Sequence, residues 1–265
     1  MAGLSLDHPW AFASGILGNL ISFMVYLAPL PTFYGIIKKK STQGFKCGPY
    51  IVALFSSMLW IYYAFVKTNE YLLISINSFG CFAETAYIII FLFYAPKDHK
   101  IRAAKAILAL NVVLFSLIVL STMLIWKGRA RLEAIGWMCV GFAVIVFAAP
   151  MSIIRQVVRT KSVEFMPFSL SFFLTLSTVA WFSYGLFTKD IYVAIPNVLG
   201  FVFGIIQMVL YLVYKDTKVE VVHKEDKLPE HEVKVHEHEM IRVTPVASEE
   251  EEERAGEGTD QASPV

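Results

Sequence analysis

Seven runs of mostly apolar residues constrain the fold of this chain more than any other feature. A helix that crosses a lipid bilayer needs about 20 such residues. The chain has 265 residues, of which 56% are hydrophobic and 17% charged, so it is more apolar than an ordinary soluble domain. We therefore predict an all-α membrane protein with seven transmembrane helices. The runs lie at residues 10–37, 49–66, 71–95, 103–126, 133–157, 167–188 and 190–214.

The cations in the loops predict which way these helices cross the membrane. The loops on one side hold 11 Lys and Arg residues, and the loops on the other side hold 5. Cytoplasmic loops carry the excess of positive charge, so we expect an extracellular N-terminus and a cytoplasmic C-terminus. Because the cations lie in short loops between apolar runs, nucleic acid is not an expected partner. The richer set is Lys38, Lys39, Lys40, Lys46, Lys97, Lys100, Arg102, Lys105, Arg155, Arg159 and Lys161.

The C-terminal segment differs from the rest in composition. Residues 215–265 hold 15 Asp and Glu against 7 Lys and Arg, and apolar periodicity stops there. Such a segment cannot bury enough apolar surface to offset the entropy lost on folding, so we predict a disordered cytoplasmic tail. The tail is a candidate for binding regulatory proteins and for phosphorylation at Thr244 and Ser248. A metal site at His231, His236 and His238 is conceivable, but we expect a solvated linker there instead.

An internal repeat organises the seven runs. Residues 15–42 align without gaps to residues 136–163 at an offset of 121, and the correspondence continues through the next two helices at offsets of 118 to 121. The run at 103–126 has no counterpart, and one inserted helix keeps both copies in the same orientation. We predict two parallel three-helix bundles joined by a linker helix (3+1+3). The boundaries are 10–95 for the first repeat, 96–132 for the linker helix with its loops and 133–214 for the second repeat.

Prolines occupy matching positions in the two copies. One pair lies inside the first helix of each unit, where proline has no N–H to donate to the carbonyls of Val25 and Val146. We expect each helix to bend there. A second pair begins the next helix, and together the four could form paired hinges on the cytoplasmic side, although proline is also tolerated in membrane helices without a gating role. The prolines are Pro29, Pro49, Pro150 and Pro167.

Polar and aromatic residues are also paired by the repeat. Asn77 and Asn197 are equivalent, and an amide in hydrocarbon is costly without a partner. They could bind sugar hydroxyls across the repeat axis, or hydrogen-bond between helices. Trp60 and Trp181 could stack on sugar rings through their indole faces, or anchor the helices at the membrane interface.

Two further features bear on substrate binding. The hydroxyls of Ser56 and Ser177 lie one turn before the paired tryptophans and share their helix face. Glu84 is the only acidic residue deep inside a predicted span, which makes it a candidate proton carrier. Its repeat partner is Gly204, so it stands outside the symmetric set.

These residues resemble the SWEET family of plant sugar transporters over about residues 8–214. The motifs that carry the resemblance are GILGN (15–19), LAPLPTF (27–33), KKKSTQGF (38–45), VRTKSVEFMPFSLS (158–171) and AIPNVLG (194–200). The resemblance implies two triple-helix bundles joined by a linker helix. It also implies facilitated, bidirectional sugar movement without ATP, ion coupling or a cofactor.

The resemblance also implies roles for single residues. Sugar binding falls on Asn77 and Asn197 and on the pocket tryptophans, and a gate contact falls on Tyr63 with Asp190. The proline tetrad coincides with the four prolines above. Ala143 stands where close relatives often have a serine that lines the pocket. The resemblance therefore does not imply a hydrogen bond from this position to the sugar, nor which sugar is bound. Size selection falls on Val25, Ser56, Val146 and Ser177, small residues typical of the sucrose-carrying branch, and we also expect Ser22 to bind substrate.

Other function classes fit less well. A seven-helix receptor would share the span count and orientation, but it has no need for a duplicated unit. No phosphate-binding glycine loop, intramembrane histidine cluster or activated nucleophile is present, so we expect neither an enzyme nor an ATP-driven pump. We predict a bidirectional sugar uniporter of the plasma membrane that moves sucrose by alternating access. The alternatives are a glucose or fructose facilitator and a proton-coupled carrier that uses Glu84, and the sequence allows a homo-oligomer.

Overall fold

The fold is a bundle of long helices, each apolar along most of its length. The computed structural model describes residues 9–42, 44–146, 148–163, 166, 168–215, 219–221 and 241–243. Within these residues seven helical spans are long and apolar enough to cross a membrane, which confirms the predicted number. They are Pro9–Lys39, Gly48–Lys67, Tyr71–Tyr94, Lys97–Ile125, Gly128–Thr160, Phe168–Phe187 and Ile191–Tyr214.

The first span breaks where the sequence predicts a bend. Helix α1 ends at Leu27 and α2 begins at Leu30, because Pro29 has no N–H with which to continue the ladder. The freed carbonyl of Val25 accepts instead from the N–H of Ala28 at 3.1 Å. The hydroxyl of Tyr87 donates to the next carbonyl, that of Tyr26, at 2.7 Å. The first unit comprises α1 (Pro9–Leu27), α2 (Leu30–Lys39), α3 (Gly48–Lys67) and α4 (Tyr71–Tyr94).

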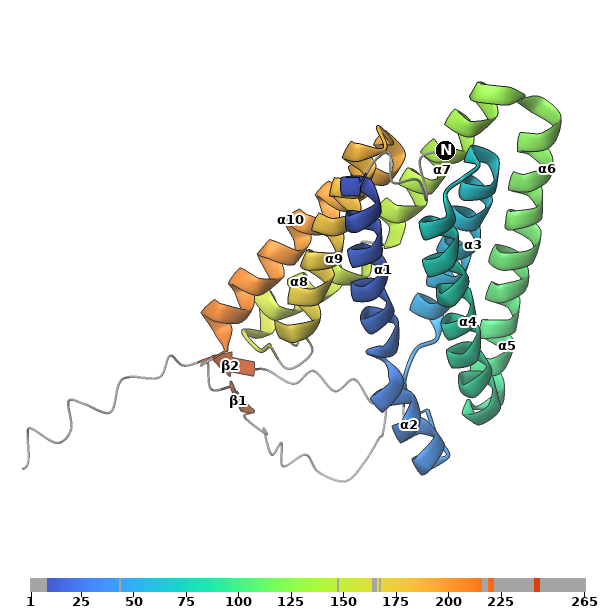
Figure 1. Cartoon of the computed structure of the whole chain (residues 1–265). Coiled ribbons are helices and arrows are strands. Elements are labelled where there is room, and N and C mark those ends of the chain that lie inside the picture. Colours follow the sequence, from blue (N-terminus) through green and yellow to red (C-terminus); the bar gives the residue numbers. More distant parts are fainter. Residues whose placement is uncertain are drawn as a thin grey trace, which may run out of the picture.

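The linker is one long helix with a widened segment in its middle. It runs through α5 (Lys97–Ile107), the π-helix η1 (Leu108–Leu114) and α6 (Phe115–Ile125) without leaving helical backbone angles. It packs on α3, where the amide of Asn111 donates to the carbonyl of Ile51 at 3.4 Å. The linker therefore lies beside the first unit (Figure 1).

The second unit repeats the first. It comprises α7 (Gly128–Val146), α8 (Ala148–Thr160), α9 (Phe168–Phe187) and α10 (Ile191–Tyr214). Contacts between the units are reciprocal, since α1 lies against α9 and its counterpart α7 lies against α3. The short helices stay within their own units, where α2 packs on α4 and α8 on α10. The units meet at the end where α3 joins α4 and α9 joins α10, and they diverge toward the opposite end (Figure 1).

Glycines in α1 allow the close contact with α9. A Cβ atom on Gly15 would lie 2.9 Å from the ring of Tyr184, and one on Gly18 would lie 2.9 Å from the indole of Trp181. Larger side chains at these two positions would push the units apart. The absence of a side chain therefore brings two large aromatic residues of the second unit against the backbone of the first.

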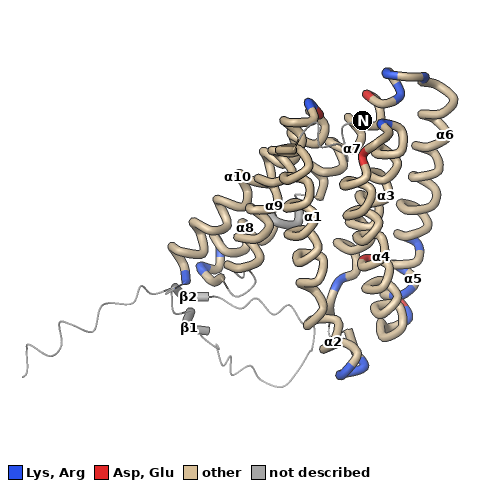
Figure 2. Tube along the Cα trace, in the orientation of Figure 1, with Lys and Arg blue, Asp and Glu red and all other residues tan. Residues whose placement is uncertain are grey.

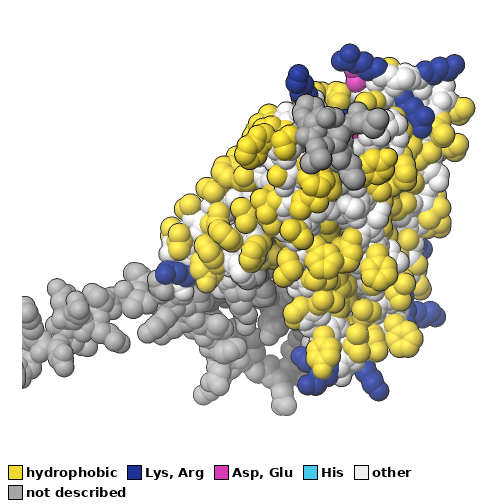
Figure 3. Space-filling view, in the orientation of Figure 1, with side chains coloured by type: hydrophobic (Ala, Val, Ile, Leu, Met, Phe, Trp, Pro, Cys, Tyr) yellow, Lys and Arg dark blue, Asp and Glu magenta, His cyan; other side chains and the backbone are white. Residues whose placement is uncertain are grey.

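The surface matches a protein surrounded by lipid. Large apolar side chains such as Phe82, Phe93 and Leu124 are exposed on the flanks of the bundle, and Figure 3 shows an apolar face between two ends that carry charge. Figure 2 places the lysines and arginines at the helix ends and in the loops. Exposed apolar surfaces of this extent are expected where lipid, and not water, surrounds the protein.

Two short strands lie beyond the last helix. Strand β1 (Val219–Val221) pairs with β2 (Ile241–Val243) in antiparallel register, with Val219 opposite Val243. The other residues beyond Lys215 lie outside the described residues, including the three tail histidines, Thr244 and Ser248. The predicted disorder of the tail stays a prediction. Within the described residues, every candidate membrane span is a helix, which agrees with the predicted fold class.

Candidate functional site

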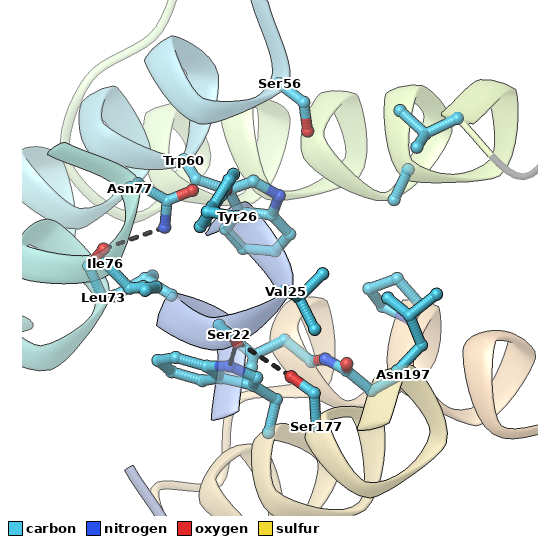
Figure 4. A pocket seen from close by; sticks show the side chains of 16 residues that line it. Ser22, Val25, Tyr26, Ser56, Trp60, Leu73, Ile76, Asn77, Ser177 and Asn197 are labelled. Atoms are coloured by element: carbon cyan, nitrogen blue, oxygen red, sulfur yellow. Dashed lines mark hydrogen bonds between the residues drawn. The ribbon is translucent and has the colours of Figure 1, made fainter. Parts of the chain in front are cut away.

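A cavity of about 330 Å³ lies between the two units (Figure 4). Its walls come from α1, α3 and α4 of the first unit and from α7, α9 and α10 of the second. Its volume lies at the lower end of the range of about 300–1,000 Å³ for small-molecule sites. The lining includes every residue predicted to bind substrate, namely Ser22, Val25, Ser56, Trp60, Asn77, Val146, Ser177, Trp181 and Asn197.

The two asparagines are held in the same way. The side-chain N–H of Asn77 donates to the carbonyl of Leu73 at 2.8 Å, and that of Asn197 donates to the carbonyl of Val193 at 2.7 Å. Each bond runs to the residue one turn earlier in the same helix, so neither amide is used to join the helices. One N–H of each amide is used within its own helix, and each side chain keeps a second N–H and a carbonyl oxygen that can bind a ligand hydroxyl.

A hydrogen-bonded group on one side of the cavity joins the two units. The indole N–H of Trp181 donates to the hydroxyl of Ser22 at 3.0 Å, and the hydroxyl oxygens of Ser22 and Ser177 are 2.8 Å apart. Ser22 comes from α1, whereas its two partners come from α9. This group therefore orients the Trp181 ring beside the cavity, where its face can contact an apolar face of a ligand.

Several lining residues were not foreseen from the sequence. Leu73 and Val193 lie one turn before the asparagines, and Ile76 and Pro196 directly precede them, each pair at an offset of 120. The repeat could have indicated them, but apolar side chains in apolar helices give no chemical signal of their own. The unforeseen lining residues are Tyr26, Leu73, Ile76, Leu174, Val193 and Pro196.

At the end where α3 joins α4 and α9 joins α10, the units are joined by a group that we call the latch, formed by Tyr63, Lys67, Glu70, Tyr184 and Asp190. The hydroxyl of Tyr63 donates to Asp190 Oδ2 at 2.8 Å, which is the contact that the resemblance implies. The ammonium of Lys67 lies 2.6 Å from the same oxygen and 2.7 Å from Glu70 Oε1. The hydroxyl of Tyr184 donates to Glu70 Oε2. The latch thus holds crossed tyrosine–carboxylate bonds with a shared cation between the carboxylates.

The repeat could have predicted the second half of the latch. Tyr184 lies 121 residues after Tyr63, and Asp190 lies 120 residues after Glu70. In the sequence, Glu70 is a charge in a short loop and gives no sign of burial. In the structure it is only 2% exposed, and Asp190 is only 4% exposed. Asp190 also caps α10, because its Oδ1 accepts from the backbone N–H groups of Tyr192 and Val193. One carboxylate therefore both caps a helix and bonds to the other unit.

The four prolines have different outcomes. Pro29 lies at the break between α1 and α2, and Pro49 lies in the first turn of α3. Pro150 is inside α8, and residue 147, between α7 and α8, lies outside the described residues. Pro167 also lies outside them. The hinge role of the four stays a prediction.

Glu84 does not belong to the cavity. It is buried in α4, it is not among the lining residues, and its Oε2 has no hydrogen-bond partner among the described residues. A carboxyl group that carries protons in exchange with the substrate would be expected to reach the cavity. Within the described part of the chain, no group of His, Cys, Asp and Glu side chains could hold a metal ion.

Comparison with known proteins identifies the family. The family model described as "Sugar efflux transporter for intercellular exchange" matches residues 12–99 and again residues 133–219, so each repeat matches it separately. This chain belongs to the SWEET family. Its relatives include the rice bidirectional sugar transporter SWEET13 (Oryza sativa subsp. japonica), which is 61% identical over 214 residues, 81% of this chain and 72% of the relative.

Other SWEETs agree with this assignment. The bidirectional sugar transporter SWEET11 of Arabidopsis thaliana is 56% identical over 218 residues, 82% of this chain and 75% of the relative. The bidirectional sugar transporter N3 of Medicago truncatula is 56% identical over 219 residues, 83% of this chain and 82% of the relative. A solved eukaryotic SWEET transporter superimposes with a TM-score of 0.75 at 31% identity and covers 80% of this chain and 99% of its own.

Proposed function

We propose that this SWEET is a facilitative uniporter that moves sucrose in both directions down its concentration gradient. The observation that carries the proposal is the cavity between the repeats. It combines two amide oxygens, two indole rings and three serine hydroxyls, which are the groups that recognise the hydroxyls and the apolar ring faces of a sugar. Related proteins named bidirectional sugar transporters support movement in both directions.

The proposed mechanism is alternating access. The latch closes the end that carries Tyr63 and Asp190, while the helices at the opposite end diverge (Figure 1). Rocking of one unit against the other would break the latch and bring the opposite ends together, with Pro29 as one pivot. Neither step needs ATP, because the sugar gradient alone decides the direction of net flow.

The proposed location is the plasma membrane, with the N-terminus outside and the tail in the cytoplasm. The loops at the diverging end contain 11 cations and those at the latch end contain 5, so the positive-inside rule places the latch outside. Regulation through the tail and assembly into homo-oligomers remain predictions from the sequence.

Sucrose is preferred over a hexose because small side chains leave room in the cavity. Val25 and Val146 are equivalent in the repeat, as are Ser56 and Ser177, and all four line the walls. Larger residues at these positions would reduce the volume that a disaccharide needs. Transport of glucose or fructose in place of sucrose is the alternative outcome of the experiment below.

The test is a transport assay on the purified full chain in liposomes. Labelled sucrose, glucose and fructose are offered in turn, with and without a proton gradient, and both entry and exit are followed. We expect sucrose both to enter and to leave until the two concentrations are equal, with no accumulation above the outside concentration. The matched control is the Asn77→Ala/Asn197→Ala variant, which lacks both amide oxygens and should carry no sucrose. Uphill accumulation under a proton gradient would refute the uniporter.

A further inference from the structure

The two halves of the cavity are alike in sequence but unlike in hydrogen bonding. In one half, the N–H of Trp181 is used by Ser22, and Ser22 is also within hydrogen-bond distance of Ser177. These groups satisfy one another without a ligand. Trp181 and Ser177 are also largely buried, at 7% and 8% exposure. This half of the cavity therefore offers a sugar the face of an indole ring and the amide of Asn197, but not the Trp181 N–H.

The other half lacks one member of this group. The repeat offset of 121 pairs Trp181 with Trp60, Ser177 with Ser56 and Ser22 with Ala143. Ala143 has no hydroxyl to accept from the Trp60 indole. Among the described residues, none forms a hydrogen bond with the Trp60 N–H or the Ser56 hydroxyl. Both residues line the cavity, and neither the indole nitrogen nor the hydroxyl oxygen is fully buried. Figure 4 shows Ser56 and Trp60 across the cavity from Ser22 and Ser177.

We propose that Ala143 makes the sugar site one-sided, so that Trp60 and Ser56 donate hydrogen bonds to oxygens of the sugar while Trp181 only stacks on it. The inference rests on the proposed function, because it requires that a sugar occupies the cavity. The indole N–H of Trp60 has no acceptor among the described residues, and an oxygen of a bound sugar would supply one. Ala143 thereby acts as a specificity-determining residue by leaving a neighbour's donor free.

The reciprocal packing explains why this single residue matters. Helix α7 lies against α3 as α1 lies against α9, and Ala143 and Trp60, the repeat counterparts of Ser22 and Trp181, both line the cavity. A serine at position 143 is therefore expected to accept from Trp60 and to approach Ser56, as Ser22 does in the other half. The sugar would then compete with an internal hydrogen bond for the same donor.

The test separates this effect from a change in size. Ala143→Ser introduces a hydroxyl, and Ala143→Cys introduces a group of similar shape that accepts hydrogen bonds weakly. Both are made in the wild-type chain and in a Trp60→Phe background, which has no N–H at this position. Displacement of labelled sucrose by unlabelled sucrose gives the affinity of each purified, full-length variant, and size-exclusion profiles check that it is folded.

We expect Ala143→Ser to weaken sucrose binding by about five-fold, the effect of losing one neutral hydrogen bond, and Ala143→Cys to change it little. In the Trp60→Phe background the serine and cysteine variants should bind equally. The inference is overturned if serine and cysteine weaken binding equally in the wild-type chain, or if serine is as harmful without the indole N–H.

Failure of the proposed function gives a different result. If the wild-type chain binds glucose or fructose and not sucrose, the substrate assignment is wrong, and the same four variants measured with the bound hexose decide the inference. If the wild-type chain binds none of the three sugars, both the sugar site and this inference are refuted.

Discussion

Removing the tyrosine hydroxyls of the latch should open the end of the bundle that it closes. Tyr63 donates to Asp190 and Tyr184 donates to Glu70, and both tyrosines are buried, at 1% and 0% exposure. These bonds join α3 to the loop before α10, and α9 to the loop before α4. They therefore exist only while the two units are in contact, and phenylalanine at either position would remove a bond without changing the packing of the ring.

The magnitude follows from the charge and the burial of the acceptors. A hydrogen bond to a charged group contributes about 1.5–3 kcal/mol, and burial of both carboxylates limits screening by water. Each carboxylate retains Lys67 after the substitution, so the lower end of this range applies. Since about 1.4 kcal/mol corresponds to a tenfold change in an equilibrium, Tyr63→Phe or Tyr184→Phe should each raise the ratio of open to closed latch about tenfold.

Distances between spin labels on the two units would measure this ratio. Tyr71 and Ile191 are exposed residues that begin α4 and α10, so labels there report the separation of the units beside the latch. Cys47, Cys81 and Cys139 must first be replaced, because they are free thiols. The wild-type chain should give a short, narrow distance distribution. Each phenylalanine variant should add a longer component, and the double variant should add more of it.

Tyr192→Phe is the matched control. The Tyr192 ring lies edge-on to Tyr63, but its hydroxyl forms no hydrogen bond to any described residue. Its distance distribution should resemble that of the wild-type chain. If Tyr63→Phe and Tyr184→Phe gave the same distribution as this control, the latch would not hold the units together, and the closed state would depend on apolar packing alone.

Three further predictions concern residues outside the latch. Glu84→Gln should leave sucrose exchange in liposomes unchanged, because Glu84 does not line the cavity, and a large loss of exchange would revive the proton-coupled alternative. Pro29→Ala restores a backbone N–H at the break in the first span, so it should slow sucrose exchange while sucrose affinity is retained, and an unchanged rate would contradict the hinge. A Cβ atom on Gly185 would lie 2.8 Å from the backbone nitrogen of Ala194, so Gly185→Ala should lower the unfolding temperature in detergent through overpacking that costs about 1–3 kcal/mol. Gly141→Ala is its control, since nothing lies within 4 Å of that position, and equal melting of the two variants would contradict the packing argument.

Much of the fold followed from the sequence because a bilayer allows few alternatives. An apolar run of about 20 residues can satisfy its backbone in hydrocarbon only as a helix or within a closed barrel. The internal repeat with one inserted helix then gave the parallel arrangement, and the paired Asn77 and Asn197 marked polar positions that needed a shared environment. The proline at position 29 also placed the break in the first span, since the missing N–H is a local property.

The rest of the site was less accessible for physical reasons. Glu70 looked like an ordinary loop charge, because its burial depends on Tyr184, which is 114 residues away. The apolar lining residues carry no chemical signal, and the face that each presents depends on how its helix rotates against its neighbours. The π-helix of the linker at Leu108–Leu114 likewise contains no proline or glycine from which it could have been predicted.

By itself, the sequence determined that this chain is a duplicated, seven-helix membrane protein whose chemistry lies in paired positions, since length, apolarity and repetition are properties of the chain alone. Only the tertiary structure decided what the paired residues do with their hydrogen bonds. Trp181 and Trp60 are equivalent in the repeat, yet Trp181 donates to Ser22 whereas the N–H of Trp60 has no acceptor among the described residues. A hydrogen bond requires two groups within about 3 Å, and helices packed across the repeat axis bring such groups together from opposite ends of the sequence.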